Sequence, residues 1–523
     1  MAIHKMKKVW EYIDGTLQEF RCCFSREATF QWFLVVVIGM MVRSDHHGVT
    51  SIVRELIIDP NKYTCLIHFF HSSGWTLEKL QKKWINIIQK SGNIFRLDGL
   101  IVLLGDGVKQ AKEATRMPGV KKLRQESEDS SKSEYIRGHM FGGLGVLVGG
   151  LAKQFCLPLS LCLHDGVKTI QEWDNSEYKE DSHVSRLVRE ACKIAQTMNE
   201  QCLLLLDRYF LTQPALKSIT EATEDNGGKS PVILITRPKD NYTAWFKPDP
   251  QPALAPEGGG TAGKAGKPKR GPKPKTDKES TAPKKEKPPL GEKVKIFDLF
   301  RTKAKEFTKT TLMLYGDCEE VGIFYANLFW GRDLFQELRF VFVNRDGDYS
   351  VFVSTALDMD PGRIVELYCY RFKIETFFRA FKQTMSGFGY HFWTRRMPAF
   401  NIFATVEAME QKIQDVTAKV SKDSITTTLN AIEGFVMFAC IAMGIIQLCS
   451  LRFTNEINHN ENRWMRTNNK GIPAEETTMV NLRFALPYLF HKCQNLALVK
   501  AIKARQADKT TVDIFDEILD ETA

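Results

Sequence analysis

The spacing of apolar residues predicts that the chain begins with helices. Over residues 1–95 apolar side chains recur every three or four positions, as in Val49–Ile57 and Trp75–Ile88, and this period is that of an amphipathic helix. Pro60 separates these two runs, because proline interrupts a helix. We therefore expect a helical N-terminal domain at residues 1–95, which is either a small DNA-binding module or a helical cap without DNA contacts.

Short continuous apolar runs replace this spacing after residue 98. Leu100–Leu104 and Cys202–Leu206 are runs of this kind, which suit strands buried on both faces. Similar patterns predict two strands within residues 142–163, a helix at Ser185–Gln201 and a strand at Val232–Ile235. Strands that then alternate with helices predict an α/β fold built on a mixed sheet.

Composition sets residues 241–353 apart from this α/β core. Pro248–Pro289 is rich in Pro, Gly, Lys and Ala and contains almost no large apolar residue, so we expect a disordered basic loop at 248–292. Its Lys269–Lys275 run either follows a DNA groove or is a solvated linker. Strand-like runs on both sides of the loop predict a β-rich insertion, which divides the chain into core segments 96–240 and 354–455, an insertion at 241–353 and a C-terminal helical region at 456–523.

The charge of the chain favours a polyanionic partner only in part. The formal net charge is +10 at pH 7, but residues 264–287 of the basic loop hold +7 of this surplus. Binding to DNA must therefore be supported by where the other cations lie, because overall charge is weak evidence.

Two apolar segments are similar to membrane spans. Phe30–Val42 is too short for a bilayer, which requires about 20 residues. Ala431–Leu451 is long enough but carries Glu433 and Gln447, so we interpret it as a buried helix. The basic N-terminus is not followed by the apolar core of a signal peptide. We therefore expect a cytoplasmic protein that does not associate with a membrane.

The stretch from Asp360 to Lys382 predicts a helix with one charged face. Asp360 suits the N-cap and Pro361 the first turn. At about 100° per residue, one arc of roughly 80° holds a carboxylate, three cations and a tyrosine, while the opposite side is apolar. These residues are Tyr368, Arg371, Glu375, Arg379 and Lys382. A stripe of this kind is usually a solvated face.

Two further acids favour a functional interpretation of this face. Asp106 and Asp207 each come at the end of a predicted buried strand, and ligands bind at the carboxyl ends of strands in open α/β sheets. Together with Glu375 they make a three-carboxylate site of the kind that binds Mg²⁺. Two such ions, about 4 Å apart, stabilise the attacking and leaving oxygens of a phosphoryl transfer. Asp165 is the main alternative to Asp106 as the first ligand.

The spacing of these residues resembles a known family. Tyr368-x2-Arg371-x3-Glu375-x6-Lys382 matches, at every position, the Y-R-E-K signature of bacterial transposases of the insertion-sequence-four type, which belong to the DDE superfamily. The segments around Asp106 and Asp207 are similar to the same group. The resemblance implies a ribonuclease-H-like catalytic core, with a β-rich insertion between the second Asp and the Glu.

The same resemblance implies the chemistry. In the family the three acids bind two Mg²⁺ or Mn²⁺ ions, the Arg and Lys contact phosphates at the transposon end, and the Tyr lies beside them. We expect Arg379, on the same helix face, to contact DNA as well. A Trp of the insertion can stack on a flipped base. Trp330 and Trp245 are the candidates here, unless they pack within the insertion.

We therefore expect a DNA transposase that binds terminal inverted repeats, cleaves a strand to free a 3′-OH and joins this 3′-OH to target DNA. Family members act as dimers on paired ends, so a homodimer is expected. One alternative is a metal-dependent DNA nuclease with the same core that does not transpose. The other is an inactive DNA-binding relic.

Overall fold

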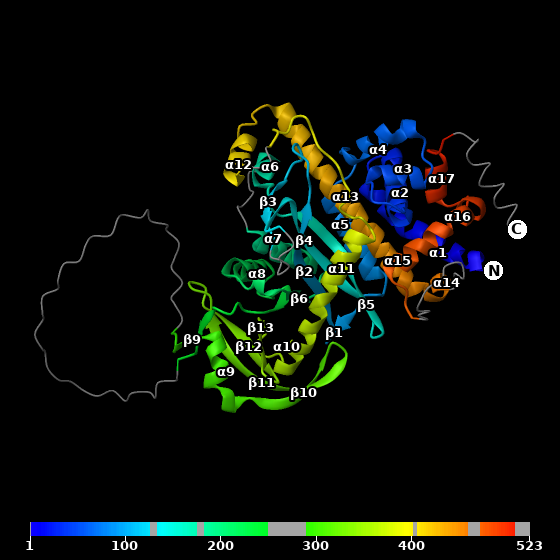
Figure 1. The fold of residues 1–523 in the computed structure, drawn as a ribbon. Coiled ribbons are helices and arrows are strands. Elements are labelled where there is room, and N and C mark those ends of the chain that lie inside the picture. The colour runs from blue at the N-terminus through cyan, green and yellow to red at the C-terminus, as the bar shows by residue number, and fades with distance from the viewer. Residues whose placement is uncertain are drawn as a thin grey trace, which may run out of the picture.

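The computed structural model describes residues 2–125, 133–174, 182–248, 289–400, 405–458 and 471–507. The described strands form one mixed sheet, and many of the helices gather in a lobe on one side of it (Figure 1). The α/β class predicted from the sequence is thus confirmed. The predicted disordered loop at 248–292 falls mainly on residues 249–288, which lie outside the described residues.

The sheet contains all the described strands of the chain. They are β1 (Arg96–Leu97), β2 (Leu100–Ala111), β3 (Lys121–Arg124), β4 (Tyr135–Gly150), β5 (Lys153–Leu163), β6 (Cys202–Leu206), β7 (Val232–Thr236), β8 (Thr243–Trp245), β9 (Lys293–Lys295), β10 (Thr308–Leu314), β11 (Asp317–Trp330), β12 (Gln336–Arg345) and β13 (Asp348–Ser354). Their order is β3-β4-β2-β6-β7-β13-β12-β11-β8-β9, and β5 pairs β4, β1 pairs β2 and β10 pairs β11. β2, β4 and β5 are antiparallel neighbours, whereas β6 and β7 run parallel to β2.

Helices from the two ends of the chain share one lobe. The lobe comprises α1 (Ala2–Gln18), α2 (Glu27–Val42), α3 (Val49–Glu55), α4 (Tyr63–Phe70), α5 (Leu77–Lys90), α13 (Lys419–Arg452), α14 (Thr454–Asn458), α15 (Glu475–Phe484), α16 (Leu486–Lys492) and α17 (Ala497–Lys503). The helices predicted for the first 95 residues are confirmed. Because α13, α15 and α17 pack on α2, the N-terminal helices share their core with the C-terminal ones (Figure 1).

The remaining helices connect or cover the strands. They are α6 (Lys168–Asp174), α7 (His183–Met198), α8 (Gln213–Asp225), α9 (Leu299–Thr302), α10 (Pro361–Tyr368), α11 (Lys373–Gln383) and α12 (Val406–Gln414). α7 corresponds to the helix predicted at Ser185–Gln201. The Ser182 side chain caps its N-terminus, and Asn199 ends it in the left-handed conformation at φ 54°.

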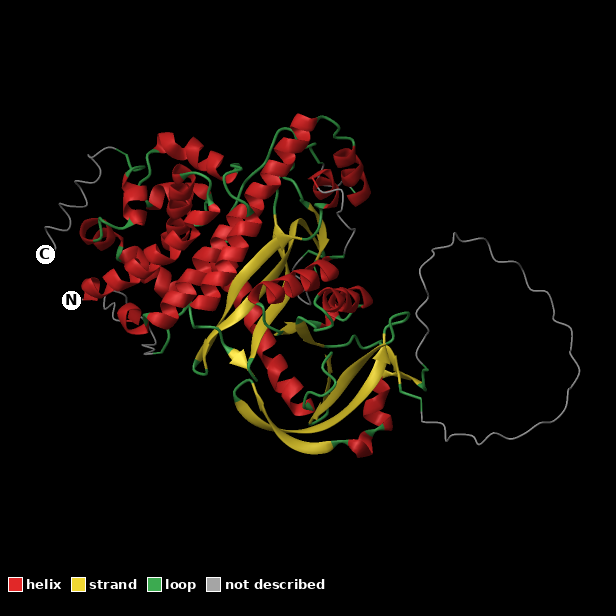
Figure 2. Cartoon of the chain, turned by 180° about the vertical axis from the view of Figure 1, so that it is seen from behind, coloured by secondary structure: helices red, strands yellow, loops and turns green. Residues whose placement is uncertain are grey.

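Helix α13 contains the longer of the two apolar segments. It is the one described helix that is long and apolar enough to cross a membrane, and 94% of its most apolar window is buried inside the protein. It packs on β5 and α2, and in the back view it runs beside the sheet (Figure 2). Glu433 accepts a hydrogen bond from the Leu163 N–H at 2.9 Å, and Gln447 donates one to the Cys156 carbonyl at 3.3 Å. Its polar side chains thus have partners in β5, which fits a buried helix.

The strands of the predicted β-rich insertion extend the core sheet. β13 pairs β7 through Val353↔Thr236 and Ser354↔Ile235, and β12 and β11 follow. The back view shows the long strands of this part curving on the side away from the helical lobe (Figure 2). The insertion is therefore continuous with the core through backbone hydrogen bonds.

The two faces of the sheet at β2 are covered by different helices. A Cβ on Gly105 would meet Leu187 of α7 at 2.8 Å, and one on Gly143 would meet Phe378 of α11 at 2.9 Å. Successive residues of a strand point to opposite faces, and Asp106 pairs with Gly143. Asp106 therefore faces α11.

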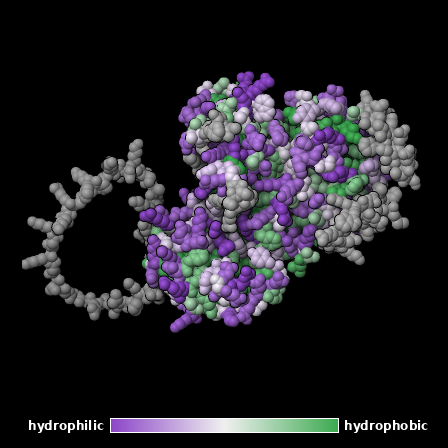
Figure 3. Space-filling model, in the orientation of Figure 1, coloured by the Kyte–Doolittle hydropathy of each residue, from purple (hydrophilic) through white to green (hydrophobic). Residues whose placement is uncertain are grey.

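Hydrophilic side chains cover much of the face of the molecule drawn in Figure 3.

Candidate active site

Neighbouring parallel strands bring Asp106 and Asp207 to equivalent positions. The register pairs Gly105 of β2 with Leu206 of β6, so the two acids are the next residues on strands whose spacing is about 4.8 Å. The prediction that Asp106 follows the end of its strand is wrong. β2 continues to Ala111 because its pairing with β4 extends that far. Asp207 does come directly after β6, as predicted.

Short hydrogen bonds fix the backbone at both acids. An Asp106 carboxylate oxygen accepts from the Gly107 N–H at 2.7 Å, and an Asp207 carboxylate oxygen accepts from the Arg208 N–H at 2.7 Å. The Thr236 hydroxyl at the end of β7 donates to the Asp207 carbonyl at 2.8 Å. Each carboxylate keeps a second oxygen for other partners.

The helix that carries Glu375 is interrupted, and the single helix predicted for residues 360–382 is wrong. Asp360 does cap α10, since its side chain accepts from the Arg363 N–H at 2.8 Å, and Pro361 begins the helix. Cys369–Phe372 then form a 3₁₀ turn before α11. A 3₁₀ turn has about three residues per turn, so the angular positions of a regular α-helix do not carry across it.

The break separates Tyr368 from the charged side chains of α11. Tyr368 is buried, and its ring meets Phe352 edge-on at 5.2 Å between centroids. Burial raises the pKa of Tyr368 above its ordinary value. Arg379 and Lys382 are exposed, as is Glu375, and Lys382 Nζ donates to the Lys109 carbonyl of β2 at 3.0 Å.

Arg371 connects two of the three acids. One of its terminal nitrogens lies 2.6 Å from Asp106 Oδ2 and the other lies 2.6 Å from Glu375 Oε1. The Arg371 side chain is only 13% exposed, whereas that of Glu375 is 62% exposed. The Nε atom of Arg371 is buried and has no hydrogen-bond partner in the described structure. A single guanidinium thus bridges the strand that carries the first acid and the helix that carries the third.

The pKa of Asp106 depends on burial and on the charges of the neighbouring groups. Burial raises the pKa of Asp106 to about 6, Arg371 and the Gly107 N–H act to lower it, and the charges of Asp207 and Glu375 raise it. Burial acts to lower the pKa of Arg371, but the negative charges around it, above all that of Asp106, raise it overall. Asp106, Asp207, Glu375 and Arg371 therefore form one coupled charge cluster.

Arg237 lies in the same region, and the sequence patterns did not predict it as a site residue. It directly follows β7, the strand beside β6, and its guanidinium lies 5.7 Å from the centroid of the Phe352 ring. Its charge acts to lower the pKa of Tyr368. The signal that points to Asp207, a polar residue at the end of a buried parallel strand, applies equally to Arg237.

The two candidate tryptophans pack against neighbours within the insertion. Trp330 is buried at the end of β11, with its ring 5.3 Å from that of Tyr242. Trp245 is partly buried on β8, edge-on to Phe335 at 5.3 Å, and Lys293 lies over its ring at 5.4 Å. Trp330 thus presents almost no surface to a base in this conformation, and Trp245 presents part of its ring.

The alternative first ligand, Asp165, lies in a different environment. It forms an ion pair with Lys121 and accepts from the Gly166 N–H at 3.0 Å. The preceding His164 shares a 2.9 Å contact between Nδ1 atoms with His183. A Cβ on Gly107 would meet His183 at 2.7 Å, so this histidine pair lies on the α7 face, opposite to Asp106.

The acids fit a divalent cation by their chemistry rather than by their present positions. In the described part of the chain, no three His, Cys, Asp or Glu side chains stand close enough to hold a metal ion. At the candidate site, the Arg371 guanidinium lies between Asp106 and Glu375. Carboxylate oxygens are nevertheless the ligands that Mg²⁺ prefers. Burial keeps the pKa of Asp106 raised, and the charges of Asp207 and Glu375 add to this effect, while Arg371 acts against it.

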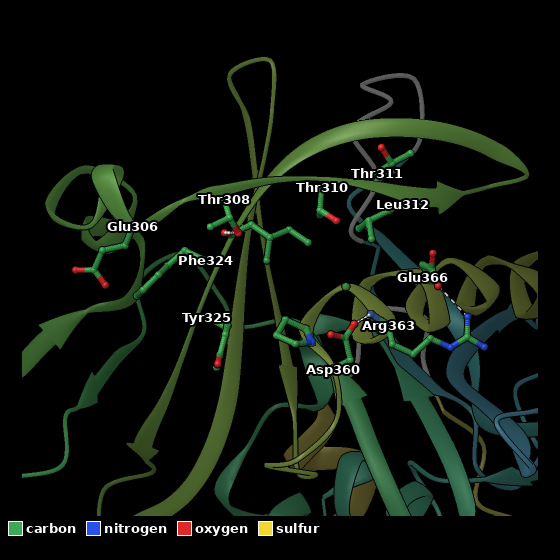
Figure 4. A pocket seen from close by; sticks show the side chains of 13 residues that line it. Glu306, Thr308, Thr310, Thr311, Leu312, Phe324, Tyr325, Asp360, Arg363 and Glu366 are labelled. Carbon is green, nitrogen blue, oxygen red and sulfur yellow. Dashed lines mark hydrogen bonds and ion pairs between the residues drawn. The ribbon is translucent and has the colours of Figure 1, made fainter.

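A separate hollow of about 670 Å³ lies between the β10–β11 hairpin and the start of α10 (Figure 4). Asp360, Glu366 and Arg363 line it, and Arg363 is held by a bidentate ion pair with Asp98. None of the three candidate metal ligands lines this hollow. It is therefore distinct from the Asp106 cluster.

Comparison of the chain with models of protein families, with curated proteins and with solved structures finds no match.

Proposed function

We propose that this protein is a DDE-type DNA transposase. The observation that carries the proposal is the pairing of β2 with β6, which sets Asp106 and Asp207 side by side, together with the Arg371 guanidinium that ties Asp106 to Glu375. The strand ends and the Y-R-E-K spacing point to the same residues in the sequence, which supports the proposal independently of these contacts.

The topology supports a ribonuclease-H-like core for this enzyme. The neighbouring strands β5-β4-β2-β6-β7 comprise three antiparallel strands, which come first in the chain, and two strands parallel to β2. Asp106 lies on β2, which is the first of these strands in the chain, and Asp207 directly follows β6, which is the fourth. Glu375 lies on the later helix α11. The strands of the insertion enter the chain between the second acid and the third, as the resemblance implies.

Each side chain has a role in the proposed reaction. Asp106, Asp207 and Glu375 would hold two Mg²⁺ or Mn²⁺ ions, which stabilise charge on the attacking and leaving oxygens of a phosphodiester. Once Arg371 releases Asp106, its guanidinium is free to bind a phosphate of the DNA end through two parallel hydrogen bonds. Lys382 and Arg379, exposed on the same helix, supply further positive charge to the backbone of the DNA.

The biological reaction would be cut-and-paste transposition. The enzyme would bind the terminal inverted repeats of its element, free a 3′-OH by cleavage and transfer that 3′-OH to target DNA. A homodimer would hold the two ends, and the protein would act in the cytoplasm of a bacterium.

The decisive experiment is a cleavage assay on DNA that carries the ends of the element. Wild-type protein should cleave in Mg²⁺ or Mn²⁺ and lose this activity in excess chelator. Asp207→Asn should be inactive, whereas Asp240→Asn, which changes an exposed acid outside the cluster, should cleave normally. Full cleavage by Asp207→Asn, or cleavage that persists in chelator, would overturn the proposal.

The same assay separates the alternatives. A nuclease with this core would release ends but give no joined products when target DNA is added. An inactive relic would bind the ends without cleaving them in either metal.

A further inference from the structure

Two segments that lead away from the acids carry a local surplus of positive charge. Residues 107–125, which follow Asp106, contain six cations and one acid, and residues 382–400, which begin in the last turn of α11, contain three cations and no acid. Two of these cations are paired with acids elsewhere, Lys121 with Asp165 and Arg124 with Glu134. Lys112 is buried, so the surplus at the surface comes from the other cations of the two segments.

The two segments are held against each other. Lys112, at the end of β2, donates to the carbonyls of Phe388 and Tyr390 at 2.7 and 2.8 Å. Further along, Arg116 donates to the carbonyls of Arg395 and Met397 at 3.0 and 2.8 Å. In Figure 1 the yellow segment after α11 continues towards α12, away from the β-rich part of the sheet.

The segment after α11 turns one tryptophan outward. Phe392 is buried against Phe70, with 5.1 Å between ring centroids, and Met397 is buried as well. Between these two anchors, the Thr394 hydroxyl contacts Ser424 at 2.8 Å, and its N–H donates to the Arg116 carbonyl at 3.3 Å. The backbone is thus fixed on both sides of the residues that point to solvent.

Trp393 is the exposed residue of this loop. It is 54% exposed, and it is the one exposed tryptophan in the described part of the chain. It lines a hollow of about 650 Å³ with Arg116, Arg395 and Glu113, and the exposed Arg396 lies next to it. Within the described residues, neither Arg395 nor Arg396 forms an ion pair, and Glu113 is the one acid in the lining.

We propose that Trp393, Arg395 and Arg396 form a second DNA-contact surface, which binds the nucleic acid beyond the cleaved bond. The proposal rests on the function proposed above, because the segment that carries this surface follows directly on α11, the helix of Glu375 and Lys382. Arginines neutralise backbone phosphates, and an exposed indole ring stacks on bases or packs on sugars. A loop held by these contacts, which offers both groups at a hollow whose lining contains one acid, Glu113, is complementary to DNA.

The distance along β2 sets where this contact falls. Ala111 is five residues beyond Asp106 in the same strand, about 17 Å at 3.3–3.4 Å per residue. Since bases are about 3.4 Å apart along a strand of B-DNA, a duplex that follows β2 from Asp106 towards this surface would reach it after about five or more base pairs.

The test is a binding titration of the full chain with a labelled 40-base-pair duplex in chelator, so that no cleavage is needed. Because each lost phosphate contact reduces the slope of log affinity against log salt by about 0.9, Arg395→Ala/Arg396→Ala should reduce this slope by about 1.8. Trp393→Ala should weaken binding on the order of ten-fold. The matched controls, Lys500→Ala/Lys503→Ala and Tyr63→Ala, remove two exposed cations and one exposed aromatic ring from the helical lobe and should change neither quantity.

Equal affinity and equal salt slope in wild type and in both loop variants would overturn the proposal. A shift of the loop variants from dimer to monomer with unchanged DNA binding would also overturn it, in favour of a subunit interface. Far-ultraviolet circular dichroism checks that the variants fold. Cleavage in Mg²⁺ is measured separately, so normal binding without cleavage by wild type would contradict the proposed function while leaving this surface in place.

Discussion

The face of the sheet at Asp106 and the interface between α13 and β5 each bury a carboxyl group. Burial raises the pKa of Asp106 to about 6 and that of Glu433 to about 7. Asp106 stands among two further acids and pairs with Arg371 near the surface, whereas Glu433 is hydrogen-bonded to the Leu163 N–H inside the protein. A raised pKa therefore does not identify an active site by itself. What makes Asp106 the candidate is that its raised pKa is joined by two further acids and an ion pair with Arg371.

The largest expected effect comes from the same substitution in the two regions. Glu375→Gln removes a proposed metal ligand and should reduce cleavage at least about a hundred-fold, since even loss of a group that only supports a ligand costs 10–100-fold. Glu433→Gln should leave cleavage at saturating metal within about two-fold, because Gln can still accept the hydrogen bond from Leu163. Initial cleavage rates of the two variants measure this contrast. Equal losses in both variants would remove the distinction between the two regions.

The sequence predicted the buried strands well because local pattern determines them. β6 is apolar at all five positions and ends at Asp207, so both its burial and its polar end could be read from spacing. The extent of β2 could not, because its continuation past Asp106 depends on pairing with β4, which residues far apart in the chain provide.

The helix at Glu375 shows the same limit. Its N-cap at Asp360 and its apolar face were predictable, but the 3₁₀ turn at Cys369–Phe372 was not. An angular calculation assumes a regular helix and therefore grouped the buried Tyr368 with the exposed Lys382. Arg237 was missed for a different reason, since attention to carboxylates leaves out a cation at the end of the neighbouring strand.

The second prediction concerns stability at Glu433. The pKa of Glu433 rises from 4.5 to about 7 on folding, so the folded state binds the proton more tightly than the unfolded state does. The stability that this tighter binding contributes is lost as pH rises from about 4.5 through 7. The cost of the buried charge is about 3 kcal/mol at pH 8, at roughly 1.36 kcal/mol per pKa unit. Glu433→Gln should remove this cost.

Denaturant unfolding at pH 5 and pH 8 measures this effect. The variant should gain stability relative to wild type on going from pH 5 to pH 8. A difference between variant and wild type that does not change with pH would contradict the raised pKa of Glu433 and weaken the comparison.

The third prediction concerns the pH dependence of cleavage. A carboxylate must be deprotonated to bind a metal ion, so wild-type cleavage should fall as pH drops through about 6, where Asp106 gains its proton. The charge of Arg371 lowers this pKa, and Arg371→Gln should therefore move the fall to higher pH. Loss of its phosphate contact should also reduce cleavage about ten- to a hundred-fold at pH 8, since hydrogen bonds to charged groups contribute about 1.5–3 kcal/mol.

The ratio of wild-type to Arg371→Gln rates, measured from pH 5.5 to 8.5, distinguishes the two contributions. The ratio should be larger at pH 6 than at pH 8. A constant ratio would mean that Arg371 contacts DNA without tuning Asp106.

The smallest effect is expected at Asp165, the alternative first ligand. Its side chain is 40% exposed and pairs with Lys121, and exposed pairs contribute about 0–1 kcal/mol. Asp165→Asn keeps the oxygen that accepts from the Gly166 N–H, so the free energy of unfolding should change by less than about 1 kcal/mol and cleavage should remain near the wild-type rate. Because the preceding His164 packs on the α7 face, opposite to Asp106, a loss as large as that of Asp207→Asn would require Asp165 to reach the metal. The first ligand would then be Asp165, and the side-by-side strands that carry Asp106 and Asp207 would no longer define the active site.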